Sequence, residues 1–311
     1  MTATGGAPPV IRVDDVRKAY GDVRAVDGVS FAVAQGEVFG LLGPNGAGKT
    51  TTVEMLEGLR APDSGDLEVL GIDAARDPAA LKERIGVTLQ TAALYPKLTV
   101  VEILDLFRSF YRRSLSTEQL IGDLDLGERR KAQTRELSGG QRQRLSIALA
   151  LVNDPEVVFL DEPTTGLDPA ARRALWDLIT GLKNQGKTVL LTTHYLEEAE
   201  VLCDRLAIMD HGKVIAMGTV DELVSARFKT RTVRYDQIPA LTDEELSSMP
   251  GVESVRHDDG ETLLYTADVA GTIGALLAAA EKLGVEPSNL GIRRPSLEDV
   301  FLDLTGRALR D

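Results

Sequence analysis

The fold is decided by the stretch Gly43-Pro44-Asn45-Gly46-Ala47-Gly48-Lys49-Thr50-Thr51. It satisfies the pattern G-x-x-x-x-G-K-[ST], in which the backbone N–H groups of a glycine-rich loop and of the next helix start bind phosphate oxygens. The apolar run Val38–Leu42 predicts a buried strand before the loop, and residues 50–59 predict the helix after it. We therefore expect a nucleoside triphosphate site, with Lys49 reaching the β- and γ-phosphates and Thr50 holding Mg²⁺. The alternative is a turn that joins strand to helix for steric reasons alone.

Composition and charge narrow the class of protein. A chain of 311 residues suggests one large domain and a smaller one, and a net charge of −13 argues against unaided binding of nucleic acid. The single cysteine, Cys203, excludes an internal disulfide framework and fits a reducing compartment. No stretch approaches the roughly 20 apolar residues that span a bilayer, and the first residues do not read as a signal peptide. We expect a cytosolic protein, or one attached to a membrane through a partner.

The pattern of elements divides the chain. Residues 1–9 predict a disordered leader. Residues 10–228 alternate strands and helices, which predicts an α/β domain with a mostly parallel sheet. Residues 229–311 predict a small α+β domain whose elements follow the order β-α-β-β-α-β, the split βαβ arrangement.

A second stretch, Val157-Val-Phe-Leu-Asp161-Glu162, supplies the acidic residues that triphosphate chemistry needs. Its apolar residues predict a buried strand that delivers two adjacent carboxylates to its carboxyl end, where ligands bind in open α/β sheets. We expect Asp161 to hold Mg²⁺, directly or through water, and Glu162 to act as general base on the attacking water. In isolation, an N-capping Asp followed by a solvated Glu would be the simpler interpretation.

The stretch Leu137-Ser138-Gly139-Gly140-Gln141 resembles the signature motif of the ATP-binding cassette (ABC) ATPases. The phosphate loop and the Asp161–Glu162 pair resemble the other main motifs of the same family. Further positions resemble motif residues of that family over about residues 10–225. Tyr20 resembles the aromatic residue that stacks on adenine, and Gln90 the glutamine that contacts Mg²⁺ and water. Asp168, in Gly166-Leu-Asp168, resembles the loop that communicates across the dimer. His194 resembles the switch histidine that contacts the γ-phosphate and pairs with the catalytic carboxylate.

The resemblance implies a P-loop NTPase cassette with antiparallel β and α-helical subdomains, and ATP with Mg²⁺ as its cofactors. It also implies a head-to-tail homodimer, in which residues 138–141 of one subunit close on the ATP bound by the other. The physical basis is a second cluster of backbone N–H groups at a helix start, formed by Ser138, Gly139 and Gly140.

The segment Arg294–Gly306 resembles the tail of ATPases from ABC-2-type exporters. This resemblance implies an ATPase subunit on the cytoplasmic face of the membrane that powers a separately encoded permease. It leaves the cargo open between drug or antibiotic, lipid and glycan.

Several alternatives remain at this point. The chain could be an import ATPase, or a non-transport ABC ATPase that acts on ribosomes or nucleic acid. The C-terminal domain could serve dimerisation, regulation or ligand binding. Tyr20 could be a packing aromatic, Trp176 reads as a core or interface residue, and His211 reads as a residue of a surface turn.

Overall fold

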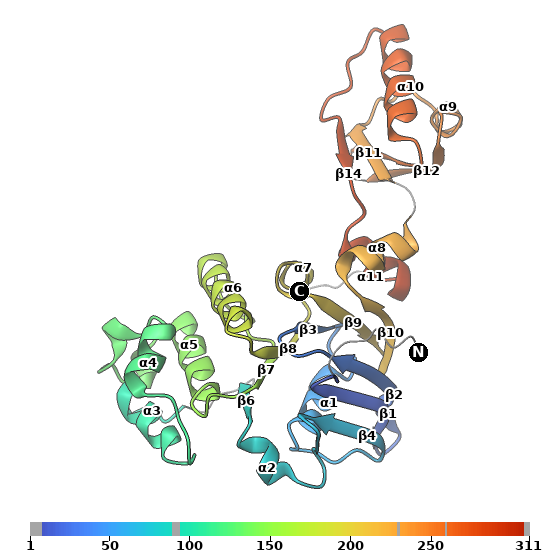
Figure 1. The fold of residues 1–311 in the computed structure, drawn as a ribbon. Coiled ribbons are helices and arrows are strands. Elements are labelled where there is room, and N and C mark those ends of the chain that lie inside the picture. Colours follow the sequence, from blue (N-terminus) through green and yellow to red (C-terminus); the bar gives the residue numbers. More distant parts are fainter. Residues whose placement is uncertain (1–7, 89–93, 229–230, 259, 308–311) are drawn as a thin grey trace. The chain divides into compact units, whose positions relative to one another are not determined.

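The computed structural model describes residues 8–88, 94–228, 231–258 and 260–307. Its contacts divide the chain into two units, Met1–Val220 and Asp221–Ala308 (Figure 1). The domain boundary expected at residue 228 stays a prediction, and most of the expected leader lies outside the described residues. Each unit is described by itself.

A six-stranded sheet forms the centre of the first unit, in the order β10-β9-β3-β8-β7-β6. Adjacent strands are parallel except in the β9–β10 hairpin. The strands are β3 (Val38–Leu42), β6 (Ile85–Thr88), β7 (Val157–Asp161), β8 (Thr188–Thr193), β9 (Arg205–Asp210) and β10 (Lys213–Gly218). β3, β7 and β8 are buried along their whole length, as strands covered on both faces are.

A second, four-stranded sheet of the first unit has the order β2-β1-β4-β5, with antiparallel pairs. Its strands are β1 (Ile11–Tyr20), β2 (Val23–Val33), β4 (Ser64–Val69) and β5 (Ile72–Asp73). The β-rich run over residues 10–16 of the sequence predicts a strand that ends at Val16, but β1 continues to Tyr20. The register shifts between Val13 and Val16, where Asp15 has φ 45°, and this bulge interrupts the alternation of apolar and polar residues.

Helices complete the first unit. They are α1 (Lys49–Leu56), α2 (Pro78–Lys82), α3 (Val100–Arg108), α4 (Thr117–Asp123), α5 (Gly139–Ala150), α6 (Pro169–Asn184) and α7 (Leu196–Leu202), with 3₁₀ turns η1 (Gly127–Arg129) and η2 (Thr134–Glu136). The helix expected over residues 50–59 ends at Leu56. Gly58 follows with φ +67°, a conformation that a continuing helix does not allow.

The central sheet separates two hydrophobic cores. Phe39, Leu41 and Phe159 face the core shared with α1 and the antiparallel sheet. Val38 and Leu160 face the core that α3, α4, α5 and α6 form on the other side. Alternate residues of one strand thus enter different cores, as the pleat of a strand requires.

The second unit is a small α+β fold. Its elements are α8 (Val220–Arg227), β11 (Arg231–Asp236), α9 (Asp243–Ser247), β12 (Val252–Asp258), β13 (Glu261–Thr266), α10 (Val269–Lys282), β14 (Gly291–Arg293) and α11 (Leu297–Thr305). The antiparallel sheet has the order β12-β13-β11-β14. Val233, Tyr235 and Leu264 pack against α9 and α10 on one face of it. The predicted order β-α-β-β-α-β is confirmed between β11 and β14.

We expect Phe39→Ala to lower the free energy of unfolding of the first unit by about 3–5 kcal/mol, the usual cost of a phenylalanine-sized cavity. Phe39 is fully buried, and its ring stacks on Phe31 at 5.2 Å between ring centres. Urea unfolding followed by circular dichroism would measure the change. Leu59→Ala, at a half-exposed position, is the control and should change it by less than about 0.5 kcal/mol. Equal effects of both variants would contradict this account of the core.

Candidate active site

The loop between β3 and α1 is folded tightly against two neighbouring segments. A Cβ atom on Gly43 would lie 2.3 Å from the carbonyl oxygen of Met209, and one on Gly48 would lie 2.3 Å from that of Ala25. Gly48 also has φ +99°, so only glycine fits there. Because the loop then runs directly into α1 at Lys49, the N–H groups at the start of that helix face outward from its first turn without intrahelical acceptors. This is the geometry of an anion site.

Lys49 is the buried cation of this loop. Its side chain is only 4% exposed, and Nζ donates hydrogen bonds to the carbonyl oxygens of Gly43 (2.7 Å) and Pro44 (3.1 Å). Nζ also lies 3.8 Å from Oε1 of Glu162. Burial lowers the pKa of Lys49, and the charges of Glu162 and Asp161 partly offset that effect. A buried ammonium held over a loop of N–H groups is placed to bind an anion.

Thr50 and Asp161 meet at the carboxyl end of β7. The Thr50 hydroxyl donates to Oδ2 of Asp161 at 3.4 Å, and the Thr192 hydroxyl donates to the other carboxylate oxygen. Burial raises the pKa of Asp161 above its usual value. A hydroxyl and a carboxylate are oxygen donors of the kind that Mg²⁺ prefers, so this pair fits the ion that the sequence predicts. Gln90, the third expected ligand, lies outside the described residues.

Glu162 is held by groups from three segments. Oε1 lies 3.3 Å from Nδ1 of His194, although the two are not aligned for a hydrogen bond. Oε2 accepts a hydrogen bond from the Thr165 hydroxyl at 3.3 Å. The backbone of Glu162 has φ 45°, a costly conformation for a residue other than glycine, and its N–H donates to the Thr192 hydroxyl at 3.0 Å. The carboxylate is thus fixed beside Lys49 and His194, and only 12% of its side chain is exposed.

Of these groups, Lys49, Thr50 and Glu162 line a cavity of about 540 Å³, and Asp161 and His194 lie just behind it, against Thr50 and Glu162. Its walls come from the phosphate loop, from Glu162, from the hairpin between β1 and β2, and from the turn between β9 and β10. Tyr20 lies on the β1–β2 side and is 42% exposed, with the Lys18 and Arg60 cations 5.9 and 5.6 Å from its ring centre. Its accessible ring is suited to stacking on a planar base.

His211 lines the same cavity, which its sequence context as a turn residue did not indicate. The turn is attached to the phosphate loop, because the N–H of Gly212 donates to the carbonyl of Ala47 at 3.1 Å. It is also attached to β2, because the N–H of Asp27 donates to the carbonyl of Gly212 at 2.8 Å. The sequence predicts the hairpin itself, with strands over residues 206–209 and 214–217 around this turn, and the structure has it. The parallel pairing of β9 with β3, which the sequence does not show, brings the turn to the site.

The predicted signature residues do not line this cavity. Ser138 caps α5, with its hydroxyl accepting from the N–H of Gln141 at 3.3 Å and the Gln141 side chain accepting from the N–H of Ser138 at 3.0 Å. Asp168 caps α6 by accepting from the N–H of Ala171 at 2.9 Å. The Ser138 hydroxyl only accepts in this cap, so the start of α5 can offer an anion both that O–H and the first N–H groups of the helix, at Gly139 and Gly140.

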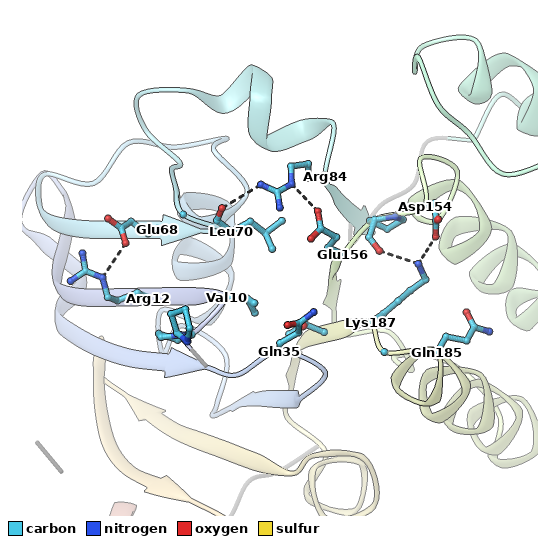
Figure 2. A pocket seen from close by; sticks show the side chains of 16 residues that line it. Val10, Arg12, Gln35, Glu68, Leu70, Arg84, Asp154, Glu156, Gln185 and Lys187 are labelled. Carbon is cyan, nitrogen blue, oxygen red and sulfur yellow. Dashed lines mark hydrogen bonds and ion pairs between the residues drawn. The ribbon is translucent and has the colours of Figure 1, made fainter. Parts of the chain in front are cut away.

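A larger cavity, of about 780 Å³, lies at the opposite edge of the central sheet (Figure 2). It is lined by residues just before β6, β7 and β8, whereas ligands of open α/β sheets bind at the carboxyl ends of the strands. Its charges are paired with one another, as Arg12–Glu68 (3.2 Å), Arg84–Glu156 (2.8 Å) and Lys187–Asp154 (2.6 Å). The cavity of the phosphate loop therefore remains the candidate active site, despite its smaller volume.

Known proteins match the chain over nearly its whole length. Residues 26–165 match the ABC transporter family, and residues 218–305 match the DrrA1-3-like C-terminal domain of ATP-binding proteins. The Nod factor export ATP-binding protein I of Ralstonia nicotianae is 42% identical, over 98% of this chain and 97% of that protein. The chain belongs to the ATP-binding subunits of ABC transporters. The daunorubicin resistance ATP-binding protein DrrA3 of Streptomyces coeruleorubidus is likewise 42% identical, over 96% of this chain and 97% of that protein.

Solved ABC cassettes share the fold. A structure of the ATP-binding subunit of an ABC transporter is 32% identical with a TM-score of 0.63, and the match covers 70% of this chain and 92% of that one. The dimeric cassette MJ0796 bound to ADP and Pi is 28% identical with a TM-score of 0.61, covering 67% of this chain and 98% of that one. The α/β P-loop cassette predicted from the sequence is thereby confirmed.

These relatives establish the activity in outline. The ABC subunit binds ATP and hydrolyses it to power export, as its sequence predicted, and such subunits work with separate membrane permeases. The relatives do not favour an import ATPase or an ATPase of the ribosome. Within the described residues, the longest apolar helices fall short of what a membrane span requires.

Glu57 is a feature of the ABC subunit's site that sequence analysis missed. It follows the last residue of α1 and is 4% exposed. Burial, with the negative charges of Asp161 and Glu54, raises its pKa to about 8. No signal in the sequence identifies it, because its neighbours read as the apolar end of a helix. Its protonated form keeps a third negative charge away from Asp161 and Glu162.

We expect Glu57→Gln to remove a pH dependence of stability. Since the folded state raises the pKa of Glu57 to about 8 from 4.5, the stability that its protonated form contributes is lost as pH rises between these values. Urea unfolding at about pH 5 and pH 8.5 should therefore show a smaller loss of stability in Glu57→Gln than in the wild type. Glu128→Gln, at an exposed position of η1, is the control and should keep the pH dependence of the wild type. An unchanged pH dependence in Glu57→Gln would contradict the buried, protonated carboxyl.

Proposed function

We propose that two copies of this chain bind ATP and Mg²⁺ head to tail, and that Glu162 activates the water that attacks the γ-phosphate. The observation that carries the proposal is the position of the Glu162 carboxylate. It lies 3.3 Å from His194 Nδ1 and 3.8 Å from Lys49 Nζ, next to the Thr50–Asp161 oxygen pair. Phosphoryl transfer needs a base for the nucleophile beside cations for the phosphates, and this arrangement supplies both.

Each group has a distinct role in this proposal. Lys49 exchanges its hydrogen bonds with loop carbonyls for contacts with the β- and γ-phosphates, and N–H groups between residues 45 and 51 bind the remaining phosphate oxygens. Glu162 accepts a proton from water, and the Thr165 hydroxyl keeps its carboxylate oriented. His194 contacts the γ-phosphate, and Tyr20 stacks on the adenine.

Mg²⁺ would be held by Thr50 and Asp161, with Gln90 as the third expected ligand. When bound, it neutralises charge on the β- and γ-phosphates. The buried position of Asp161 supports this role, because burial raises its pKa and a bound cation would favour the ionised form.

The homodimer is proposed because the signature residues and Asp168 lie outside the cavity. Asp161 and His194 do not line the cavity either, but they lie against its lining residues Thr50 and Glu162. Ser138 and Asp168 instead cap α5 and α6, and we assign residues 138–141 and Asp168 to the nucleotide held by a second copy. A two-fold arrangement uses the same surface on both subunits and creates two equivalent sites. The dimeric form of the related cassette MJ0796 supports this assignment.

The partner and place in the cell are also proposals. We propose that the dimer acts at the cytoplasmic face of the membrane on an ABC-2-type permease and binds no nucleic acid, as its net charge of −13 favours. Relatives are named for Nod factor export and for daunorubicin and linearmycin resistance. We infer a cargo of the same kind, a drug, lipid or glycan product, which the permease selects. The second unit would serve dimerisation, regulation or ligand binding.

We expect Glu162→Gln to bind ATP and to hydrolyse it at least about a hundredfold more slowly, the usual order for loss of a general base. Size-exclusion chromatography with ATP should then detect a trapped dimer, while Lys49→Ala should lose ATP binding in calorimetry. Glu156→Gln, just before the other end of β7, is the matched control and should keep normal turnover (Figure 2). Normal turnover in Glu162→Gln would refute the assignment of the base.

We expect tagged Glu162→Gln, purified from mildly solubilised membranes with ATP, to bring a polytopic membrane protein with it. Mass spectrometry would identify that protein, and Lys49→Ala treated in the same way is the control that should recover less of it. Recovery of ribosomal proteins or DNA in place of a membrane protein would leave the ATPase intact and overturn the proposed partner.

A further inference from the structure

A buried polar contact joins the two helices that follow the motif loops. α6 and α7 lie side by side in the first unit (Figure 1). The indole N–H of Trp176, on α6, donates to Oε1 of Glu198, on α7, at 3.3 Å. Glu198 is completely buried and Trp176 is 8% exposed. A glutamate in such a place is unusual, because charged side chains are rarely buried completely unless they are paired.

Each helix begins one or two residues after a residue of the proposed active site. α6 starts at Pro169, directly after Asp168, whose side chain caps it. α7 starts at Leu196, two residues after His194. The contact between Trp176 and Glu198 therefore connects, within one chain, the segment assigned to the partner's nucleotide with the segment that carries the switch histidine.

A second contact joins the same two segments. The guanidinium of Arg172, one turn before Trp176 on α6, lies 4.6 Å from the ring centre of Tyr195. The Tyr195 ring in turn lies 4.2 Å from the ring of His194. A cation over an aromatic face is attractive, so α6 contacts the neighbour of His194 as well as α7.

Several buried polar atoms around these contacts have no hydrogen-bond partner among the described residues. They are Oε2 of Glu198, the Thr164 hydroxyl, Nε of Arg172 and Nδ1 of His194. The Thr164 hydroxyl nevertheless lowers the pKa of Glu198, so it lies near that carboxyl. These atoms form one buried polar cluster between the loop after Glu162, α6 and the His194 segment.

The charge of Glu198 belongs to the same cluster. Burial raises its pKa, and the hydroxyls of Thr193 and Thr164, the Trp176 indole and the Arg172 cation partly offset that rise. Thr193 directly precedes His194, and its hydroxyl accepts from the N–H of Tyr195 at 2.9 Å. The groups that face the Glu198 carboxyl thus come from three segments, which are the end of β8 before His194, the loop after Glu162, and α6.

We propose that Glu198 is a positioning residue for His194: by holding Trp176 it fixes α7 relative to α6, so that movement of the Asp168 segment is transmitted to the switch histidine. The inference rests on the roles proposed above for Glu162 and His194. It predicts an effect on the hydrolysis step and little effect on nucleotide binding, because Glu198 does not line the nucleotide cavity. α7 has seven residues and cannot hold its own direction without such contacts.

The first test compares Glu198→Ala with Glu198→Gln in the full chain. Glu198→Ala should lower kcat at least about tenfold and leave the ATP dissociation constant within about twofold, since a misplacement of about 1 Å costs up to about a hundredfold in rate. Glu198→Gln should keep kcat within about threefold, because its amide oxygen still accepts from the Trp176 N–H. Glu197→Ala, at the adjacent exposed position, is the control and should keep wild-type turnover.

Trp176→Phe is the second variant, which keeps a buried ring and removes the donor. It should reproduce the fall in kcat, and the double variant Trp176→Phe/Glu198→Ala should be no slower than Glu198→Ala, since both changes break one contact. Wild-type kcat in Glu198→Ala or in Trp176→Phe would overturn the inference. A parallel loss of ATP binding, measured by calorimetry, would also overturn it, because that pattern indicates general structural damage.

The positioning role of Glu198 and the proposed roles of Glu162 and His194 can fail separately, and different variants show which one has failed. If Glu162→Gln and His194→Ala both keep normal turnover, the roles assigned to those residues are wrong. If both are slow while Glu198→Ala and Trp176→Phe are normal, only the positioning role is wrong.

Discussion

The parallel pairing of β3, β8 and β7 is the constraint on which the site depends. In this register Leu42 lies opposite Thr193, and Asp161 lies opposite Thr192. Three segments that are far apart in the sequence therefore end at one edge of the sheet. The phosphate loop, the acidic pair and His194 lie at or directly after these strand ends, so the pairing of the strands alone brings them close together.

Several charged side chains are buried near the carboxyl ends of these strands. Lys49 is nearly fully buried beside two carboxylates, Asp161 and Glu162, and Glu57 adds a third carboxyl from the end of α1. Burial lowers the pKa of Lys49 and raises those of Asp161 and Glu57, and so works against the charged form of each of these three groups. Such opposed shifts are typical of sites that bind ions and move protons, whereas a purely structural ion pair would be more simply satisfied.

Sequence patterns predicted the parts of this protein that local chemistry determines. The phosphate loop follows from glycine spacing, Asp161 and Glu162 from their place after an apolar strand, and the small domain from the order of its elements. The patterns missed what long-range pairing determines. His211 reaches the cavity through the pairing of β9 with β3. The bulge in β1 hid that this strand extends to Tyr20, and Glu57 is buried only by the packing around α1. The roles of the individual site residues stay predictions.

The hydrogen bond between Gly212 and Ala47 lies close, along the sequence, to the point where the first unit ends. It holds the turn that opens β10 (Lys213–Gly218) against the phosphate loop, and β10 is the last strand before the second unit begins at Asp221. Along the chain, one strand and two further residues therefore separate the start of the second unit from a turn that is hydrogen-bonded to the phosphate loop. A displacement of Ala47 would act directly on the first residues of the strand from which the chain continues into that unit.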